Sequence, residues 1–418
     1  MTKGIMIAAP SSGAGKTTIT LALLRALKDA GLTYASAKSG PDYIDPRFHE
    51  MASGTSCTNL DAWAMSPTRI QSLASTSDNL LIEAAMGLFD GAGIAGTGSA
   101  AELAGILDAP IILCVDAAKQ AHSVSALISG FLTHDSRLDI AGIILNRVGS
   151  PKHEDMLRHA LSPLNLPILG AIPRRVELSL PERHLGLVQA REHPEIDEFI
   201  THAARIVAKH VDIEKLHTLA GSLQTTNEIS PLPPPAQRIA IAQDDAFAFS
   251  YPHMLQDWRT AGAELSFFSP LADEAPGDVD FVYLPGGYPE LHTGTLAANQ
   301  NFKSGIQKAQ QVYGECGGYM VMGKTLIDAK GTAHKMTGVL DLVTSFKAPK
   351  LHLGYRELGS LGLFETDFRG HEFHYAATIE ANGKPLFKAK NADGNELPNM
   401  GLQSGGFAGS FAHIIDRV

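Results

Sequence analysis

The sequence is poor in cysteine and has no long apolar segment. Its 418 residues include only three cysteines, Cys57, Cys114 and Cys316, and no two of them form a CxxC pair. This scarcity argues against a disulfide framework or a zinc site and suits a reducing compartment. No stretch approaches the roughly 20 apolar residues of a membrane-spanning helix, and the opening MTKGIMIAAPSSGAGKTT is not typical of a signal peptide. We therefore expect a cytoplasmic protein.

Positive charge is also scarce. Lysine and arginine number 34 against 44 aspartates and glutamates, which gives a formal net charge of −10 at pH 7. There is no run rich in lysine or arginine, so neither nucleic acid nor an anionic membrane is expected as a partner. An anionic ligand would have to be held by a local site.

The chain is long enough for two or three domains. In the first half, short runs that are apolar throughout alternate with helical patterns, which is typical of parallel strands covered on both faces. This alternation predicts a doubly wound α/β sheet. The apolar runs are residues 4–9, 79–85, 109–118, 141–148 and 166–173.

A break in this pattern divides the chain. Residues 222–237, SLQTTNEISPLPPPAQ, have no periodicity and hold four prolines, so they predict an interdomain linker, with an active-site loop as the alternative. We expect one domain over residues 1–221 and a smaller α/β domain over residues 238–418, where the strand–helix alternation restarts. Beyond Gly331, glycines and short runs predict a mixed or antiparallel end to the second sheet.

A phosphate-binding pattern follows the first apolar run. APSSGAGKTT matches GxxxxGK[ST] at Gly15, Lys16 and Thr17, although Pro10 occupies the first glycine position. Such a loop turns backbone N–H groups toward phosphates, and the next helix adds the partial positive charge of its N-terminus. We expect Lys16 to reach the β- and γ-phosphates and the Thr17 hydroxyl to ligate Mg²⁺. The loop predicts a nucleoside triphosphate site.

Three further segments carry polar residues that could serve this site. KSGPDYIDP supplies Lys38 for a phosphate, and Asp42 and Asp45 for Mg²⁺ or substrate, although a capped turn would also explain these residues. Glu83 ends an apolar run, where such folds place an acidic metal partner. Asn146 ends another and could read a base edge through its amide or cap a turn.

A second chemical pattern surrounds Cys316. GECGG lies between an apolar run and the helical pattern YMVMGKTLID, as in a nucleophile elbow, where a tight turn presents the side chain. We expect the following helix to lower the pKa of the thiol, because the thiolate is the attacking species. Backbone N–H groups at Gly287 and Gly317 could form an oxyanion hole, typically worth ~3 kcal/mol per donor.

A cysteine nucleophile needs a base, and the candidates are His371, His374 and His413. The other cysteines are expected to be structural, with Cys114 inside a core strand and Cys57 in a polar loop.

Six segments together resemble the cobyrinate/hydrogenobyrinate a,c-diamide synthases of cobalamin biosynthesis: APSSGAGKTT, KSGPDYIDP, EAAMGLFDG, LPGGYPEL, YGECGGYM and GHEFHY. The N-terminal half is similar to dethiobiotin synthetase and the C-terminal half to a triad class I glutamine amidotransferase. The resemblance implies a P-loop NTPase domain with a doubly wound parallel sheet, and a second, flavodoxin-like α/β domain.

The resemblance also implies the reaction. Glutamine would be hydrolysed at the cysteine, and ammonia would pass to the ATP-binding domain, where a corrin carboxylate is activated as an acyl phosphate. The a and c acetate side chains would be amidated in turn. The implied substrates are a corrinoid polycarboxylate, L-glutamine and ATP with Mg²⁺, and a homodimer is plausible by analogy with dethiobiotin synthetase.

Residue by residue, the resemblance makes Cys316 the nucleophile and His413 its activating base. The usual polar group two residues after this histidine is missing, because Ile415 and then Asp416 follow, so the third triad member is unassigned. GHEFHY matches a signature of the family, and our hypothesis is that it lines the corrinoid or ammonia path. The resemblance matches Gly13, Gly15, Lys16, Thr17 and Thr18 to the nucleotide loop. The full set of predicted nucleotide-binding residues is Gly13, Ala14, Gly15, Lys16, Thr17, Thr18, Lys38 and Asn146, and the predicted metal-binding residues are Thr17, Asp45 and Glu83.

Several alternatives stay open. The substrate could be cobyrinate, although NLDAWAM at residues 59–65 favours metal-free hydrogenobyrinate. A cobyric acid synthase-type sibling is disfavoured by the chain length and by GPDYIDP, and a nickel-sirohydrochlorin homologue is a further possibility. From a different class comes a MinD-like regulatory ATPase with an inactive amidotransferase domain, against which the intact elbow and His413 argue.

Overall fold

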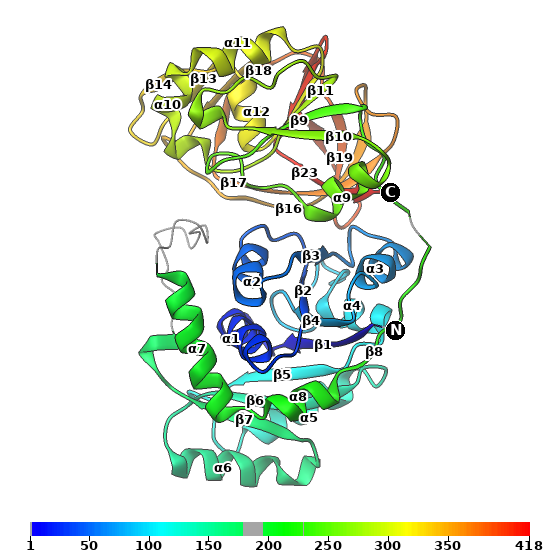
Figure 1. The fold of residues 1–418 in the computed structure, drawn as a ribbon, viewed down its shortest axis with the longest axis vertical. Coiled ribbons are helices and arrows are strands. Elements are labelled where there is room, and N and C mark those ends of the chain that lie inside the picture. Colours follow the sequence, from blue (N-terminus) through cyan, green and yellow to red (C-terminus); the bar gives the residue numbers. More distant parts are fainter. Residues whose placement is uncertain (1, 179–194, 229) are drawn as a thin grey trace. The chain divides into compact units, whose positions relative to one another are not determined.

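A computed structural model describes residues 2–178, 195–228 and 230–418. The chain divides into two compact units, the first comprising Met1–Gly91 and Ala95–Ser230 and the second Ala92–Ile94 and Pro231–Val418. Figure 1 shows the elements of both units, which are described separately below.

The first unit contains a parallel sheet in the order β3-β2-β4-β1-β5-β6-β7, with β8 antiparallel beside β1. Most side chains in these strands are buried on both faces, and this explains why the strands read as continuous apolar runs. The predicted doubly wound parallel sheet is confirmed. The strands are β1 (Lys3–Ala8), β2 (Ala35–Ser39), β3 (Cys57–Leu60), β4 (Asn79–Glu83), β5 (Ile111–Asp116), β6 (Ile140–Val148), β7 (Ile168–Pro173) and β8 (Gly221–Ser222).

Helices follow most of these strands. The first begins at Lys16, directly after the phosphate-binding loop, and it ends at Asp29, two residues before Gly31, whose φ is 79°. The helices are α1 (Lys16–Asp29), α2 (Asp45–Ser53), α3 (Pro67–Ala74), α4 (Ala100–Leu107), α5 (Val124–His134), α6 (Pro151–Leu161), α7 (Ile196–His210) and α8 (Ile213–Leu219), with 3₁₀ turns η1 (Ser162–Leu164) and η2 (Val176–Leu178).

The start of the expected linker belongs to this sheet. Ser222 in β8 pairs with Lys3, and Gly221 pairs with Gly4. The side chain of Leu223 packs so closely on Gly4 that a Cβ there would lie 2.6 Å from its Cδ1. Residues 222 and 223, the start of the expected linker, therefore pack on the first sheet.

The second unit contains a parallel sheet in the order β10-β9-β11-β12-β22, with β21 antiparallel to β22 at the edge. Numbered along the chain, its parallel strands run 2-1-3-4-5, which is the flavodoxin-like order. These strands are β9 (Arg238–Ala242), β10 (Glu264–Phe268), β11 (Phe281–Leu284), β12 (Val312–Glu315), β21 (Leu402–Ser404) and β22 (Phe407–Ser410). The helices are α9 (Pro252–Thr260), α10 (Thr293–Ala298), α11 (Gln300–Lys308) and α12 (Gly317–Met322), with 3₁₀ turns η4 (Pro270–Ala272) and η5 (Pro289–Leu291).

Two further sheets follow α12, in the orders β14-β13-β15-β18 and β20-β19-β16-β17-β23. The expected mixed end of the main sheet is confirmed by β21, which is antiparallel to β22, but most strands beyond Gly331 form separate sheets, which was not expected. Strands such as β18 leave most residues exposed, which an antiparallel sheet with one solvated face allows and a doubly covered parallel sheet does not. The strands are β13 (Thr325–Ile327), β14 (Ala333–Lys335), β15 (Asp341–Ser345), β16 (His352–Ser360), β17 (Phe368–His374), β18 (Ala377–Asn382), β19 (Phe387–Asn391), β20 (Glu396–Met400) and β23 (His413–Arg417).

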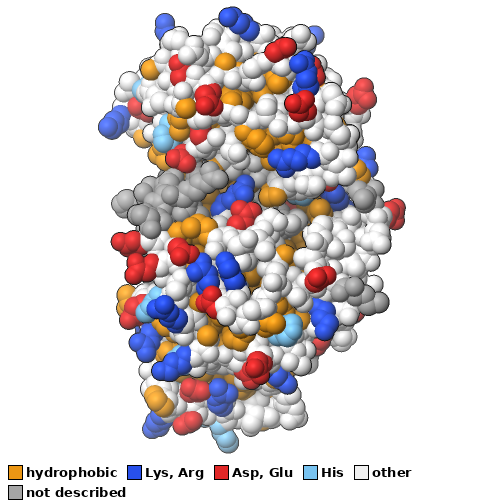
Figure 2. Space-filling model, viewed as in Figure 1, with side chains coloured by type: hydrophobic (Ala, Val, Ile, Leu, Met, Phe, Trp, Pro, Cys, Tyr) orange, Lys and Arg blue, Asp and Glu red, His pale blue; other side chains and the backbone are white. Residues whose placement is uncertain are grey.

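Each unit has its own hydrophobic core. On the face drawn in Figure 2, lysine and arginine side chains are interspersed with acidic ones and do not gather into a field of one sign. Among the described residues, none of the helices has the length and hydropathy needed to cross a membrane.

Candidate functional sites

The phosphate-binding loop joins β1 to α1 with two glycines in left-handed conformations. Gly13 has φ 77° and Gly15 has φ 91°, a region that side chains rarely adopt. Asn146, at the end of β6, donates a hydrogen bond from Nδ2 to Ala14 O at 2.8 Å. A Cβ on Gly15 would lie 2.4 Å from this nitrogen, so only glycine leaves room for Asn146 against the loop.

Two loop side chains reach across to β4 and the segment after it. Lys16 Nζ donates to the carbonyl oxygens of Ser11, at 3.4 Å, and Met86. Burial lowers the pKa of the Lys16 ammonium, while the Glu83 carboxylate opposes that shift. Thr17 Oγ1 donates to Glu83 Oε1 at 2.6 Å and lies 3.4 Å from Asp45 Oδ2.

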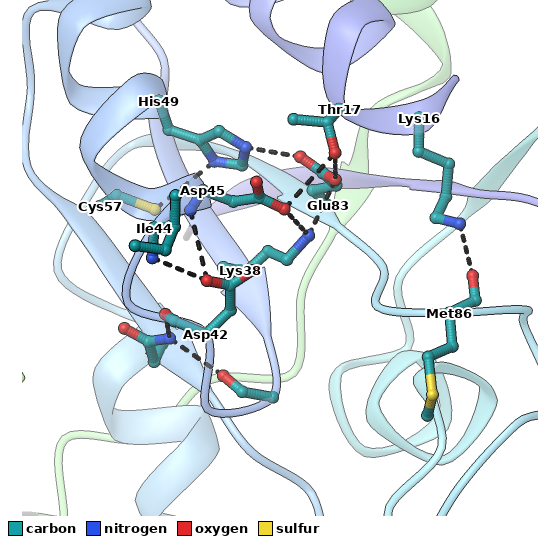
Figure 3. A network of polar contacts seen from close by, with 12 residues as sticks. Lys16, Thr17, Lys38, Asp42, Ile44, Asp45, His49, Cys57, Glu83 and Met86 are labelled. Atoms are coloured by element: carbon teal, nitrogen blue, oxygen red, sulfur yellow. Dashed lines mark hydrogen bonds and ion pairs between the residues drawn. The ribbon is translucent and has the colours of Figure 1, made fainter. Parts of the chain in front are cut away.

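A buried lysine lies between the two carboxylates (Figure 3). Lys38 Nζ is 2.6 Å from Asp45 Oδ2 and 2.8 Å from Glu83 Oε1. Burial opposes the charge on Lys38, but the carboxylates outweigh it and raise the pKa of its ammonium above the usual range. Burial likewise opposes the charge on Glu83, whose pKa is held low by Lys38 and His49.

His49 extends this network and was missed in the sequence. Its Nε2 lies 2.6 Å from Glu83 Oε2, and its Nδ1 lies 3.5 Å from Cys57 Sγ. A signal was available: His49 follows Asp45 by four residues in α2, so both side chains share one face of that helix. Cys57 is not in a polar loop as expected but begins β3 and is fully buried.

Asp42 serves the turn before α2. Its Oδ1 accepts hydrogen bonds from Ile44 N at 2.7 Å and Asp45 N at 3.4 Å. Burial and the neighbouring Asp45 raise the pKa of its carboxyl to about 7. This capping is the structural alternative considered for KSGPDYIDP, and it leaves Asp45 as the carboxylate of this segment that faces Thr17.

All of the predicted nucleotide and metal residues except Ala14 line one cavity of about 570 Å³. No group of three histidine, cysteine or acidic side chains suited to a metal occurs in the described parts of the chain. The oxygens of Thr17, Asp45 and Glu83 do converge, and hydroxyl and carboxylate oxygens suit Mg²⁺, which keeps several waters and phosphate oxygens as further ligands. The residues lining the cavity include Gly13, Gly15, Lys16, Thr17, Thr18, Lys38, Asp42, Asp45, Glu83, Asn146 and Arg147.

Cys316 stands between β12 and α12 with φ 45° and ψ −101°. Its backbone N–H donates to Ser410 O at 2.8 Å. A Cβ on Gly318 would lie 1.9 Å from Leu284 O, so glycine at this position lets α12 pack directly on the end of β11. Strand, strained cysteine and closely packed helix form a nucleophile elbow.

The expected lowering of the thiol pKa is wrong. Burial, and next the charge of Glu290, raise the pKa of Cys316 above its usual range. The side chain is 4% exposed, and α12 has only six residues, so the helix terminus does not outweigh desolvation. The resting thiol is therefore protonated and depends on a base.

His413 begins β23 beside His371 on β17, with ring centroids 5.0 Å apart. Burial, together with His371 and His374, lowers the pKa of His413 well below its ordinary value, which favours the neutral form that a base requires. A Cβ on Gly286 would lie 2.3 Å from His413 Cε1. The first glycine of PGG thus makes room for the histidine ring.

The second glycine of that pair lies against the elbow. A Cβ on Gly317 would lie 3.1 Å from Gly287 N, so the backbone nitrogens proposed for an oxyanion hole come from segments in contact. Further along the chain, His371 Nε2 lies 3.0 Å from Tyr251 OH, and the His374 ring stacks on Phe411 at 3.9 Å.

A buried acid precedes the cysteine, and sequence reasoning missed it. Glu315 is 1% exposed and ends a strand in which all four residues are buried. An acidic residue at the end of an apolar strand was the signal used for Glu83, and it applies equally here.

Comparisons with known proteins agree with these two sites. Residues 5–188 match the family model of the CobQ/CobB/MinD/ParA nucleotide binding domain, and residues 238–417 match that of the CobB/CobQ-like glutamine amidotransferase domain. A hydrogenobyrinate a,c-diamide synthase of Brucella abortus is 53% identical over 99% of this chain and 98% of its own length. The chain belongs to this family. Enzymes of the same name from Rhizobium meliloti and Rhodobacter capsulatus are 50% and 48% identical, each over 99% of this chain and 99% and 98% of their own lengths.

Proposed function

We propose that the protein is a glutamine-dependent ligase that converts two acetate carboxylates of hydrogenobyrinate, a and c, into amides with the consumption of ATP. One observation carries this proposal. A chain that such synthases match end to end holds both a cavity with a phosphate-binding loop and a buried cysteine elbow. A carboxylate needs activation before ammonia can displace oxygen from it, and each site supplies one half of that chemistry.

In the first unit, the loop residues would bind the triphosphate, with Lys16 moving from Met86 O to the β- and γ-phosphates. The substrate carboxylate would take the γ-phosphoryl group to give an acyl phosphate and ADP. Ammonia would then attack the acyl carbon, and phosphate would leave. Lys38, which already neutralises two carboxylates, would also stabilise the negative charge of the phosphates.

Mg²⁺ would be held by Thr17, Asp45 and Glu83, whose oxygens converge at 2.6 and 3.4 Å. The ion would neutralise charge on the phosphate oxygens. The three protein ligands fix where the terminal phosphates lie relative to the cavity.

In the second unit, His413 would take the thiol proton of Cys316 as the sulfur attacks the side-chain amide carbon of glutamine. The same proton would pass to the departing nitrogen, which leaves as ammonia. Water would hydrolyse the resulting thioester to glutamate. Gly287 and Gly317 would offer backbone N–H groups to the oxyanion.

The test is a mass measurement on the corrinoid product with glutamine labelled with ¹⁵N in its side chain. We expect two labelled amides on hydrogenobyrinate, only with ATP and Mg²⁺. Cys316→Ser should lose glutamine hydrolysis but still amidate the corrinoid from ammonium salts. Loss of that ammonia-dependent amidation would contradict the two-site scheme, and no amidation by the wild-type protein would contradict the function.

Cobyrinate is the second candidate substrate, and it differs from hydrogenobyrinate only by the metal. The same assay, run on both corrinoids, decides which of the two is amidated. A MinD-like regulatory role predicts ATP hydrolysis without glutaminase activity. We further propose residues 1–221 as the carboxylate-activating domain, residues 238–418 as the amidotransferase domain and a homodimer as the assembly, which sedimentation of the purified protein would test.

A further inference from the structure

The position that holds the third triad member in related amidotransferases, two residues after the histidine, is Ile415 in this chain. Ile415 is fully buried and has no polar atom in its side chain. Asp416 follows, and its Oδ1 accepts a hydrogen bond from Arg417 N at 2.8 Å. In the ladder between β17 and β23, Asp416 pairs with Arg369, whereas His413 pairs with His371.

The carboxylate beside His413 comes instead from the elbow strand. Glu315 Oε2 lies 3.8 Å from His413 Nδ1, and the two side chains are 1% and 2% exposed. Glu315 Oε1 accepts a hydrogen bond from Ile414 N at 3.0 Å. One carboxylate therefore contacts both the histidine and the backbone of the residue that follows it.

The Oε2 oxygen of Glu315 is fixed from the neighbouring strand. Tyr283 OH, on β11, donates to Oε2 at 2.7 Å. Two hydrogen bonds thus hold the carboxylate in one orientation, with Oε2 toward the imidazole. Because Glu315 directly precedes Cys316, the acid and the nucleophile share one rigid turn.

We propose that Glu315 is the acidic partner of His413, a positioning residue that fixes the imidazole with Nδ1 protonated and Nε2 turned toward the thiol. When Nε2 takes the proton of Cys316, the ring becomes an imidazolium, and the Glu315 carboxylate, with Oε2 3.8 Å from Nδ1, stabilises that charge electrostatically. Glu315 accepts no proton in this step. The proton moves from Sγ to Nε2 and then to the departing amide nitrogen, which leaves as ammonia.

The electrostatic surroundings explain why an acid is needed here. The titratable groups that act directly on His413 are Glu315 from β12 and His371 and His374 from β17. Tyr283 from β11 and Tyr313 from β12 act on Glu315, and Tyr251 before α9 contacts His371. Burial and the two neighbouring histidines all disfavour an imidazolium. Burial raises the pKa of the Glu315 carboxyl to about 7, while the hydrogen bonds from Ile414 N and Tyr283 oppose that rise. A carboxyl of this kind is readily ionised when a positive charge forms beside it.

The inference rests on the proposed glutaminase activity, so the test compares variants within that activity. Glu315→Gln keeps the size and one acceptor but removes the charge. We expect kcat for glutamine hydrolysis to fall about 100-fold or more with KM little changed, as when the acid of a Ser-His-Asp triad becomes an amide. Ammonia-dependent amidation, which bypasses the cysteine, reports whether the fold and the nucleotide site survive.

A double-mutant cycle separates positioning from general damage. In a His413→Asn background, Glu315→Gln should cost little further activity, because residues that act as one unit are not additive. An equal loss in both backgrounds would overturn the proposal, and so would a Glu315→Gln enzyme with wild-type kcat. If the wild-type protein hydrolyses no glutamine, or if Cys316→Ser still hydrolyses it, the proposed function is wrong. That outcome is distinct from a failure of the role of Glu315.

Tyr283→Phe covers the case in which Glu315→Gln does not fold. The hydrogen bond from Tyr283 lowers the pKa of Glu315, so its loss should raise that pKa. The rising limb of the pH profile of glutamine hydrolysis should then move to higher pH, with the plateau preserved. An unchanged profile would overturn the proposal.

Discussion

Lys38 has a structural task at the nucleotide site that can be separated from any contact with phosphate. Its ammonium neutralises Glu83 and Asp45, whose side chains are 1% and 21% exposed. Lys38→Met would leave the carboxylates without this partner, and removing one member of a buried ion pair costs about 3–5 kcal/mol. We expect chemical denaturation to show a loss of that size.

The matched control is Lys324→Met. Lys324 pairs with Asp341 at 2.7 Å, but its side chain is 54% exposed, and exposed pairs contribute about 0–1 kcal/mol. Equal losses in the two variants would contradict the role assigned to Lys38.

His371 makes the stability of the second unit depend on pH. Burial lowers its pKa to about 3, whereas an unfolded histidine titrates near pH 6.5. Since the unfolded state takes up the proton first, the stability contributed by neutral His371 is complete above about pH 6.5 and is lost as the pH falls toward 3.

His371→Gln removes this proton uptake. The difference in unfolding free energy between wild type and variant should therefore shrink by about 2 kcal/mol between pH 7 and pH 5. Denaturant titrations at both pH values measure it, and a difference independent of pH would show that His371 has the same pKa in the folded protein as in the unfolded chain.

Among elements, α12 depends most on one residue. Gly318→Ala would bring a Cβ within 1.9 Å of Leu284 O, a backbone atom that cannot move aside. Overpacking of this kind costs about 1–3 kcal/mol or more, and displacement of α12 would also misplace Cys316. We expect a lower melting temperature together with loss of glutamine hydrolysis.

Gly294→Ala is the control within the same unit. Gly294 lies in α10, and a Cβ there would meet nothing within 4 Å. Alanine is favoured over glycine in a helix by about 0.5–1 kcal/mol, so this variant should keep or gain stability. A Gly318→Ala protein as stable and active as the Gly294→Ala protein would show that the elbow tolerates a side chain.

The elements that could be predicted from the sequence are those with a local signature. The strands β1, β4 and β5, buried except at one end residue, read as apolar runs, and the glycine loop before α1 follows from its residue types. The sheets after α12 could not be placed, because which short antiparallel strands pair is decided by partners distant in the chain.

The sites divide in the same way. Lys16, Thr17 and Cys316 stand in short motifs, so their segments were recognisable, whereas His49 and Glu315 matter through contacts with residues 34 and 98 positions away. The thiol pKa was mispredicted for a related reason, because desolvation depends on burial that no short segment reveals.

At the scale of the whole molecule, the two units carry separate hydrophobic cores and separate sites. ADP with Mg²⁺ should bind the first unit, and a glutamine analogue that alkylates a catalytic cysteine should react with Cys316 in the second. The nucleotide, which binds reversibly and only to the folded state, stabilises it by about 2.7 kcal/mol at 100 times its Kd, whereas the covalently attached analogue stabilises through the contacts that it makes in the folded site. Calorimetry should therefore resolve two unfolding transitions, one raised by the nucleotide and the other by the analogue.

The matched control is Cys316→Ser, in which the analogue should shift neither transition while the nucleotide still shifts one. A single transition raised equally by both ligands would show that the units unfold as one.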